Sequence, residues 1–146
     1  MSKKVLFLCS GNYYRSRFAE HLFNHLAIKR HLGWRAESRA LSTEIGSWKT
    51  GPISVYAAEG LTQRNIPVDN PHREPLYCNT EDLESADMII ALKEAEHRKM
   101  LKEKFPTWED KVQYWHVHDI DKAHPKDALK ELDELVCKLV AKLAAG

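Results

Sequence analysis

A cysteine and an arginine stand six residues apart, directly after the first apolar run of the chain. The stretch CSGNYYRS begins at Cys9 and contains Gly11, Asn12, Arg15 and Ser16. Glycine permits a tight turn and asparagine tolerates left-handed backbone, so successive amides can point inward and bind an anion. A guanidinium adds a bidentate fork that matches two phosphate oxygens. The stretch therefore predicts a phosphate-binding loop.

Cys9 has two interpretations at this place in the chain. Cysteine is often a small buried hydrophobic residue, and Arg15 could then be an ordinary surface side chain. However, a helix N-terminus and a nearby arginine both favour the thiolate form of a cysteine. Ser16 supplies a hydroxyl that can donate to that thiolate. Since all of these residue types occur together between an apolar run and a helical pattern, the sequence favours a nucleophile.

Apolar runs alternate with helical patterns along the chain, and this alternation positions the loop. The runs at 5–8, 34–41, 86–92 and 111–117 predict strands. The segments between and after them predict helices at 15–33, 51–66, 93–105 and 125–145. Such alternation is typical of a parallel sheet with helices on both faces, and ligands bind at the carboxyl ends of its strands.

The overall composition excludes several function classes. The 146 residues include 22 basic and 21 acidic side chains, which nearly cancel, so the sequence lacks the charge of a nucleic-acid or membrane-surface binder. No apolar run approaches the roughly 20 residues of a membrane helix. The three cysteines are odd in number and have no CxxC spacing. We expect a cytoplasmic protein with reduced thiols.

The chain resembles the low-molecular-weight protein tyrosine phosphatases. The loop pattern of that family, CxGNxCRS, is matched at Cys9, Gly11, Asn12, Arg15 and Ser16. The later stretches SRAL, GPISVYAAEGL and ADMIIAL also fall where the family has counterparts. The resemblance implies one α/β domain over 1–146, a three-layer sandwich. It implies a four-stranded parallel sheet of order 2-1-3-4, flanked by helices, with the phosphate loop after strand 1.

The resemblance also implies a mechanism. Cys9 would attack phosphorus and form a cysteinyl-phosphate intermediate, while Arg15 holds the equatorial oxygens. It implies neither a metal nor a cofactor. The other loop residues that would bind phosphate or support the loop are Ser10, Gly11, Asn12, Tyr13, Tyr14 and Ser16.

The general acid must come from another part of the chain. The family carries an aspartate in the loop after the fourth strand, where this sequence reads YWHVHDIDKAHP. Asp119 lies at the predicted strand exit and matches best, with Asp121 as the alternative. Either could instead be a helix cap or a solvated charge. Ile120 replaces the usual proline, and Asp121 and Lys122 stand where aromatic residues often wall the pocket, so preference for aryl substrates is open.

Several residues near the loop differ from the family pattern. Tyr14 stands where many members have a second loop cysteine, so we expect no local disulfide with the nucleophile. Tyr13 lies at the expected pocket edge. Trp48 could form the opposing aromatic wall or simply pack onto the body of the protein. Arg17 replaces the usual proline and is expected to draw anionic substrates to the entrance.

Two further residues are expected to support the loop. Ser38 and His72 resemble family residues that hold Asn12, although an ordinary surface histidine is an alternative for His72. Among the other histidines, His116 and His118 alternate along the predicted fourth strand and form at most half of a metal site. No metal is therefore expected.

The sequence thus predicts a phosphomonoester hydrolase, with protein-tyrosine phosphatase as the first interpretation. Its partner would be a phosphorylated protein or a small phosphomonoester, and the oligomeric state is not indicated. An arsenate reductase on the same fold is an alternative, but its two relay cysteines are missing after the third predicted strand. A phosphate-binding or phosphoprotein-binding domain with weak catalysis is the other alternative, supported by the altered DIDK segment.

Overall fold

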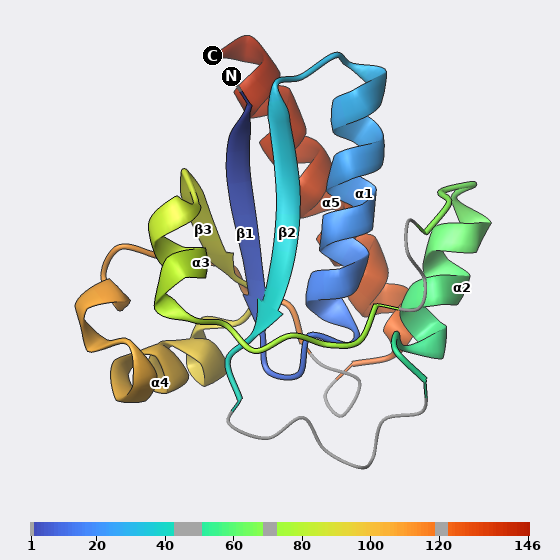
Figure 1. The fold of residues 1–146 in the computed structure, drawn as a ribbon. Coiled ribbons are helices and arrows are strands. Elements are labelled where there is room, and N and C mark those ends of the chain that lie inside the picture. Colours follow the sequence, from blue (N-terminus) through green and yellow to red (C-terminus); the bar gives the residue numbers. More distant parts are fainter. Residues whose placement is uncertain (1, 43–50, 69–72, 119–122) are drawn as a thin grey trace.

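Four parallel strands form one sheet in the order β2-β1-β3-β4, so the predicted α/β class and strand order are confirmed. The computed structural model describes residues 2–42, 51–68, 73–118 and 123–146 (Figure 1). The strands are β1 (Lys3–Cys9), β2 (Trp34–Ala40), β3 (Met88–Ala91) and β4 (Gln113–Tyr114).

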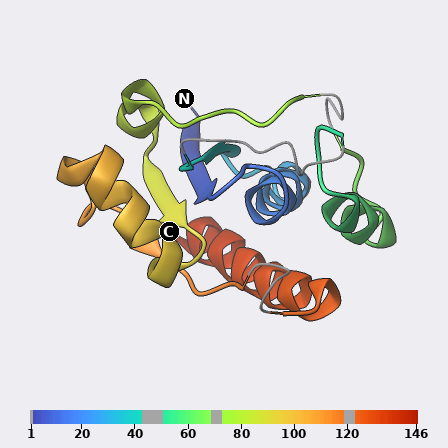
Figure 2. The same cartoon turned by 90° about the horizontal axis from the view of Figure 1, so that it is seen from below.

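Helices cover both faces of the sheet, as expected from right-handed crossovers between parallel strands. Figure 2 views the molecule from the edge where the strands end, with α1 and α5 on one side of the sheet and α3 and α4 on the other. The described helices are α1 (Arg15–Lys29), α2 (Val55–Gln63), α3 (Thr80–Ser85), α4 (Glu94–Lys104), the 3-10 turn η1 (Pro106–Trp108) and α5 (Pro125–Ala145).

Strand β1 is the centre of the hydrophobic core. Val5 and Phe7 contact the core on the side of α1, α2 and α5, while Leu6 and Leu8 contact a second cluster beneath α3 and α4. All four side chains are fully buried. A strand covered on both faces requires a continuous apolar run, which is why VLFL occurs here. Because β1 lies between β2 and β3, the strand order reverses at β1. Ligands usually bind at the carboxyl ends of the strands at such a point.

Local structure differs from the expectations at several places. Helix α2 begins at Val55, inside the predicted 51–66, because Ser54 caps it. The fourth strand is shorter than the predicted 111–117, because after Tyr114 the chain leaves the β3 register and His116 pairs antiparallel with Lys93. Helix α3 was missed, although Asn79 begins it with a capping box. Helix α1 ends before the predicted stop at 33, since His31 already takes the left-handed conformation with φ 51°.

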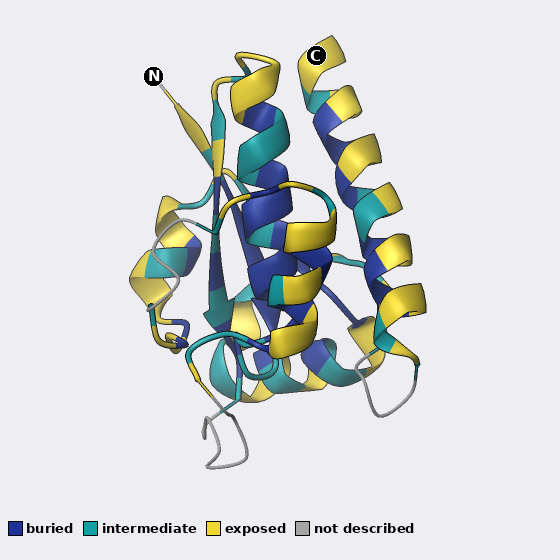
Figure 3. Cartoon of the chain, turned by 90° about the vertical axis from the view of Figure 1, so that its right-hand side faces the viewer, coloured by how far each residue is buried: buried dark blue, intermediate teal, exposed yellow. Residues whose placement is uncertain are grey.

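Helix α5 shows the clearest amphipathic pattern, with one face buried against the core (Figure 3). Cys137 does not belong to this buried face: it is exposed and its thiol lies 3.2 Å from Oδ1 of Asp133. One position separates it from buried Val136, and each residue of a helix rotates the side chain by about 100°. Within the described residues, no helix is long and apolar enough to cross a membrane.

Candidate active site

The loop between β1 and α1 is held by hydrogen bonds to its carbonyl groups. The carbonyl oxygen of Cys9 accepts from the amide of Leu41 at 2.9 Å, and that of Ser10 accepts from Ser42 at 3.0 Å. In a trans peptide the C=O and the following N–H point in opposite directions. The amides of Ser10 and Gly11 therefore point away from these two neighbours, as an anion-binding loop requires.

Asn12 holds the loop in a left-handed turn, with φ 51°. Its side-chain amide donates to the hydroxyl oxygens of Ser16 at 2.9 Å and Ser38 at 2.8 Å. Its carbonyl oxygen accepts from the backbone N–H of Leu76 at 3.0 Å and from Arg73 at 3.2 Å. Because both oxygen partners can only donate, the orientation of the amide is determined. All four hydrogen-bonding positions of Asn12 are used, and its side chain is fully buried.

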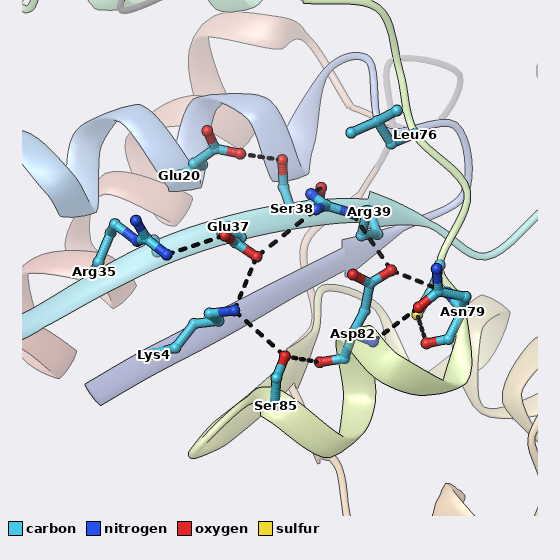
Figure 4. A network of polar contacts seen from close by, with 12 residues as sticks. Lys4, Glu20, Arg35, Glu37, Ser38, Arg39, Leu76, Asn79, Asp82 and Ser85 are labelled. Atoms are coloured by element: carbon cyan, nitrogen blue, oxygen red, sulfur yellow. Dashed lines mark hydrogen bonds and ion pairs between the residues drawn. The ribbon is translucent and has the colours of Figure 1, made fainter. Parts of the chain in front are cut away.

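Ser38 is held by two charged side chains, Glu20 and Arg73. Its hydroxyl donates to Glu20 (Figure 4). Arg73 lies 3.1 Å from both Ser38 Oγ and Glu20 Oε1. The expected neighbour Ser38 thus lies against Asn12. Arg73 and Glu20 were not assigned any contact with Asn12 or Ser38 from the sequence, because spacing along the chain does not reveal contacts across the sheet edge.

The thiol of Cys9 lies 2.9 Å from the hydroxyl oxygen of Ser16. Cys9 is 3% exposed and is the last residue of β1. Since the Asn12 amide already donates to Ser16, the Ser16 hydroxyl proton is available for the sulfur. If Cys9 is a thiolate, Ser16 must be the donor. The geometry thus supports a stabilised sulfur nucleophile.

Arg15 is the first residue of α1, and its side chain is 2% exposed. Its Nη1 donates to the carbonyl oxygen of Val117 at 3.0 Å, and both terminal nitrogens lie near the carboxylate of Glu96. Val117 belongs to the segment after β4, which leads to Asp119. The arginine of the loop therefore contacts the same segment that carries the expected general acid.

Helix α1 directs its positive end at the loop. Tyr14 precedes the helix and gives no side-chain cap, and no acidic residue occurs in the described first turn. A helix N-terminus without a nearby carboxylate in its own turn attracts anions through its dipole. Among the remaining loop residues, Tyr14 is buried in the core, whereas Tyr13 is half-buried.

Helix α4 contributes an ionisable cluster beside the loop that the sequence analysis did not identify. Burial would raise the pKa of Glu96, but the charge and hydrogen bonds of Arg15 outweigh it and lower that pKa. Burial, and then the charge of Arg15, lower the pKa of His97 to about 3. His97 is therefore neutral near pH 7, and its 4.0 Å approach to Glu96 is not an ion pair. The sequence could have indicated these two residues, because both follow β3 and the carboxyl end of β3 lies beside that of β1.

Arg17 does not occupy the entrance, so the expectation that it attracts substrates there is wrong. Its side chain is fully buried, and Nη1 donates to the backbone oxygens of Pro52 at 2.8 Å and Arg73 at 3.0 Å. Burial, and then the nearby charge of Arg73, lower the pKa of Arg17 to about 10, so it stays charged near pH 7. Arg17 thus links two segments of backbone near the loop.

Four expected site residues, Trp48, His72, Asp119 and Asp121, lie outside the described residues. In the described chain, no group of three or more histidine, cysteine, aspartate or glutamate side chains is placed to hold a metal ion. The rings of His116 and His118 do meet edge to face, with centroids 4.8 Å apart.

A buried cysteine at the end of a central strand, a braced turn and an arginine at a helix N-terminus fit a phosphate-binding loop. The family model for low molecular weight phosphotyrosine protein phosphatase matches residues 4–143. The chain belongs to this family, so the resemblance stated from the sequence is confirmed.

Individual relatives differ in the substrate that their names give. A protein-arginine-phosphatase of Bacillus subtilis is 31% identical over 109 residues, covering 74% of this chain and 67% of the relative. A human low molecular weight phosphotyrosine protein phosphatase is 30% identical over 102 residues, covering 68% of this chain and 60% of the relative. The matched stretch is thus about two thirds of these relatives or less.

Solved structures match nearly the whole fold. The low molecular weight protein tyrosine phosphatase from T. tengcongensis superposes with a TM-score of 0.79 at 27% identity, covering 97% of this chain and 99% of that one. YfkJ from Bacillus subtilis gives a TM-score of 0.82 at 24% identity, covering 98% and 95%. The latter supports the fold alone.

Proposed function

We propose that this chain is a phosphatase that hydrolyses phosphorylated side chains of proteins, with Cys9 as nucleophile. The observation that carries the proposal is the contact of Cys9 Sγ with Ser16 Oγ, at 2.9 Å, inside a loop that also contains buried Arg15. A buried sulfur with a hydroxyl donor and a guanidinium nearby suits attack on phosphorus better than a structural role.

In the first step, the Cys9 thiolate forms a bond to phosphorus while the bond from phosphorus to the leaving oxygen or nitrogen breaks. Arg15 and the loop amides stabilise the charge on the equatorial oxygens. Asp119 donates a proton to the leaving group. The assignment of the acid role to Asp119 is supported by Val117, two residues earlier, whose carbonyl oxygen accepts from Arg15.

In the second step, water attacks phosphorus and the bond between phosphorus and sulfur breaks. Asp119, now ionised, accepts a proton from that water. Inorganic phosphate leaves, and the Ser16 hydroxyl stabilises the released thiolate of Cys9. The residues named here complete the cycle without a cofactor.

Two substrate classes are favoured by specific observations. Family membership favours phosphotyrosine. The 31% identical relative named as a protein-arginine-phosphatase favours phosphoarginine.

The cysteines Cys9, Cys78 and Cys137 are all free, which suits a reducing compartment such as the cytoplasm.

The test is hydrolysis of an aryl phosphate and of phosphotyrosine and phosphoarginine peptides by the wild type and four variants. We expect Cys9→Ser to abolish turnover and Asp119→Asn to lower kcat by roughly two to four orders of magnitude, the usual worth of general acid catalysis. The matched controls are Cys137→Ser, at the exposed thiol, and Asp121→Asn, at the neighbouring carboxylate; both should keep wild-type kcat.

Each other outcome identifies a different error. A wild type that binds phosphate but hydrolyses none of the three substrates would contradict the proposal and favour a binding domain. Thioredoxin-dependent reduction of arsenate would instead indicate the reductase. A large loss in Asp121→Asn with normal activity in Asp119→Asn would transfer the acid role to Asp121.

A further inference from the structure

The first turn of α4 packs its polar side chains against the phosphate loop. Glu96 and His97 reach Ser10 from this turn, each with an atom 3.2 Å from the Ser10 hydroxyl oxygen. The Lys93 ammonium lies 3.5 Å from Glu96. These groups are absent from the two-step mechanism above, yet Glu96 contacts both Ser10 of the loop and Arg15.

Glu96 approaches one particular edge of the Arg15 guanidinium. Its Oε2 lies 3.4 Å from Nη1 and its Oε1 lies 3.3 Å from Nη2, so the carboxylate meets the two terminal nitrogens end-on. The Val117 carbonyl uses the same Nη1 at 3.0 Å. A guanidinium has a second forked edge, formed by Nε and Nη2, which also matches two oxygens of a phosphate. Glu96 and Val117 use the first edge and thereby determine the direction of the second.

His97 and Ser10 in turn hold Glu96. The backbone N–H of Lys93 donates to Nδ1 of His97 at 3.0 Å, so Nδ1 carries no proton. The neutral ring must then carry its proton on Nε2, which donates to Ser10. The Ser10 hydroxyl proton is left to donate to Oε1 of Glu96. The hydrogen bonds therefore run in one direction, from His97 through Ser10 to Glu96.

The charges around Glu96 are consistent with its role as the acceptor of these hydrogen bonds. Glu96 faces two cations, Arg15 and Lys93, so it remains a carboxylate within a site that must attract anions. It is 30% exposed, whereas Arg15 is 2% exposed and His97 is fully buried. A carboxylate here lowers the net attraction for phosphate, and a binding role alone therefore would not explain it. Orientation of the arginine does.

We infer that Glu96 is a positioning residue for the phosphatase reaction: with Ser10 and His97 behind it, it aims the second forked edge of Arg15 at the equatorial oxygens of the transition state. The inference rests on the proposed function. Such positioning stabilises the transition state, in which the equatorial oxygens are planar, more than the tetrahedral ground state. The reason is that only correctly aimed donors form stronger hydrogen bonds after the change of geometry.

The test compares Glu96→Gln with Glu94→Gln, which removes the same charge from the same helix but from a residue paired with Arg98. For Glu96→Gln we expect kcat to fall roughly tenfold to 100-fold, because small errors in the position of a catalytic group have effects of that size. Inhibition by vanadate, which takes the trigonal bipyramidal geometry, should weaken by a similar factor. Inhibition by inorganic phosphate should change by less than roughly threefold, since ground-state binding does not need the aimed edge. Glu94→Gln should match the wild type in all three.

Other outcomes overturn the inference. If Glu96→Gln keeps wild-type kcat and vanadate inhibition, Glu96 does not aim Arg15. If vanadate and phosphate weaken equally, Glu96 has only a structural role in the loop. If wild type hydrolyses no phosphate ester, the proposed function fails by itself, and calorimetric binding of vanadate and phosphate to the same variants still decides the role of Glu96.

A double-mutant cycle tests the relay without relying on one variant. Ser10→Ala keeps the loop amide but removes the hydroxyl, and we expect it to lower kcat by roughly threefold to tenfold. In Glu96→Gln/Ser10→Ala the loss should be close to that of Glu96→Gln alone, because Ser10 acts through Glu96. Multiplicative losses would show that Ser10 acts independently and would remove it, with His97, from the positioning group.

Discussion

The two ends of the phosphate loop are held by different kinds of interaction. Asn12 is neutral, fully buried and saturated by four hydrogen bonds of 2.8 to 3.2 Å. Arg15 is held by a carbonyl at 3.0 Å and by a carboxylate at 3.3 and 3.4 Å that is itself 30% exposed. The first end determines the backbone of the loop, and the second determines the direction of one charged side chain. We therefore expect damage at Asn12 to affect folding, and damage near Arg15 to affect catalysis.

The largest effect is expected from Asn12→Ala. It removes the four hydrogen bonds of the amide and places alanine at φ 51°, so the free energy of unfolding should fall by about 3 kcal/mol. Activity should fall by more than roughly 100-fold. Asn12→Gly loses the same hydrogen bonds but adopts this φ without strain, and should be about 1 kcal/mol more stable than Asn12→Ala. Equal stabilities of the two variants in urea titrations would mean that the left-handed turn does not contribute.

An intermediate effect is expected from pH, through His97. Its pKa is about 3 in the folded protein, against an ordinary value of 6.5, so below pH 6.5 the unfolded chain binds a proton that the folded chain refuses. Stability therefore decreases as the pH falls from 6.5 toward 3, and between pH 7 and pH 5 the loss should be about 2 kcal/mol. The charged groups that face His97 are Arg15, Lys93 and Glu96, and Glu96 stays ionised over this interval because its pKa is lowered.

The control for this pH dependence is a histidine on another helix. His97→Gln should remove most of the difference in unfolding free energy between pH 7 and pH 5, whereas His25→Gln on α1 should keep it. If the pH dependence persists in His97→Gln, then His97 is not the buried neutral group that causes it.

The smallest effect is expected from Lys93→Met, which removes one of the two cations near Glu96 and leaves Arg15 in place. Arg15 remains as the bidentate partner, and the apolar Met side chain suits a position that is 6% exposed. A single pair to a partly exposed carboxylate is worth about 0.5 kcal/mol, so kcat/KM should change by less than roughly threefold. A loss as large as that of Glu96→Gln would show that the site depends on the total charge around Glu96, and not on the direction of Arg15.

The fold and the loop could be predicted from the sequence because both depend on neighbours along the chain. VLFL predicts a strand buried on both faces, and the residue types from Cys9 to Ser16 predict an anion-binding turn. The contact of Ser38 with Asn12 was expected only through the family resemblance. Residues 119–122, which contain the expected acid, lie outside the described residues, so the role of Asp119 stays a prediction.

The rest of the site depends on contacts between residues that are far apart in sequence. Arg15 and Glu96 are 81 residues apart, and Asn12 and Arg73 are 61 apart. No periodicity connects such pairs; they meet because parallel strands end at one edge of the sheet. For the same reason the burial of Arg17 was missed, since a charged residue at a helix start is usually exposed.

By itself, the sequence determined the alternation of strands and helices apart from α3, the place of the loop and the identity of the expected nucleophile, because these follow from local spacing and residue chemistry. Only the tertiary structure decided which groups surround the loop. It placed the neutral His97 and the carboxylate of Glu96 beside Arg15, and it buried Arg17 beneath backbone carbonyls. The physical reason is that protonation and orientation depend on burial and on neighbouring charges, and both arise only when distant segments pack together.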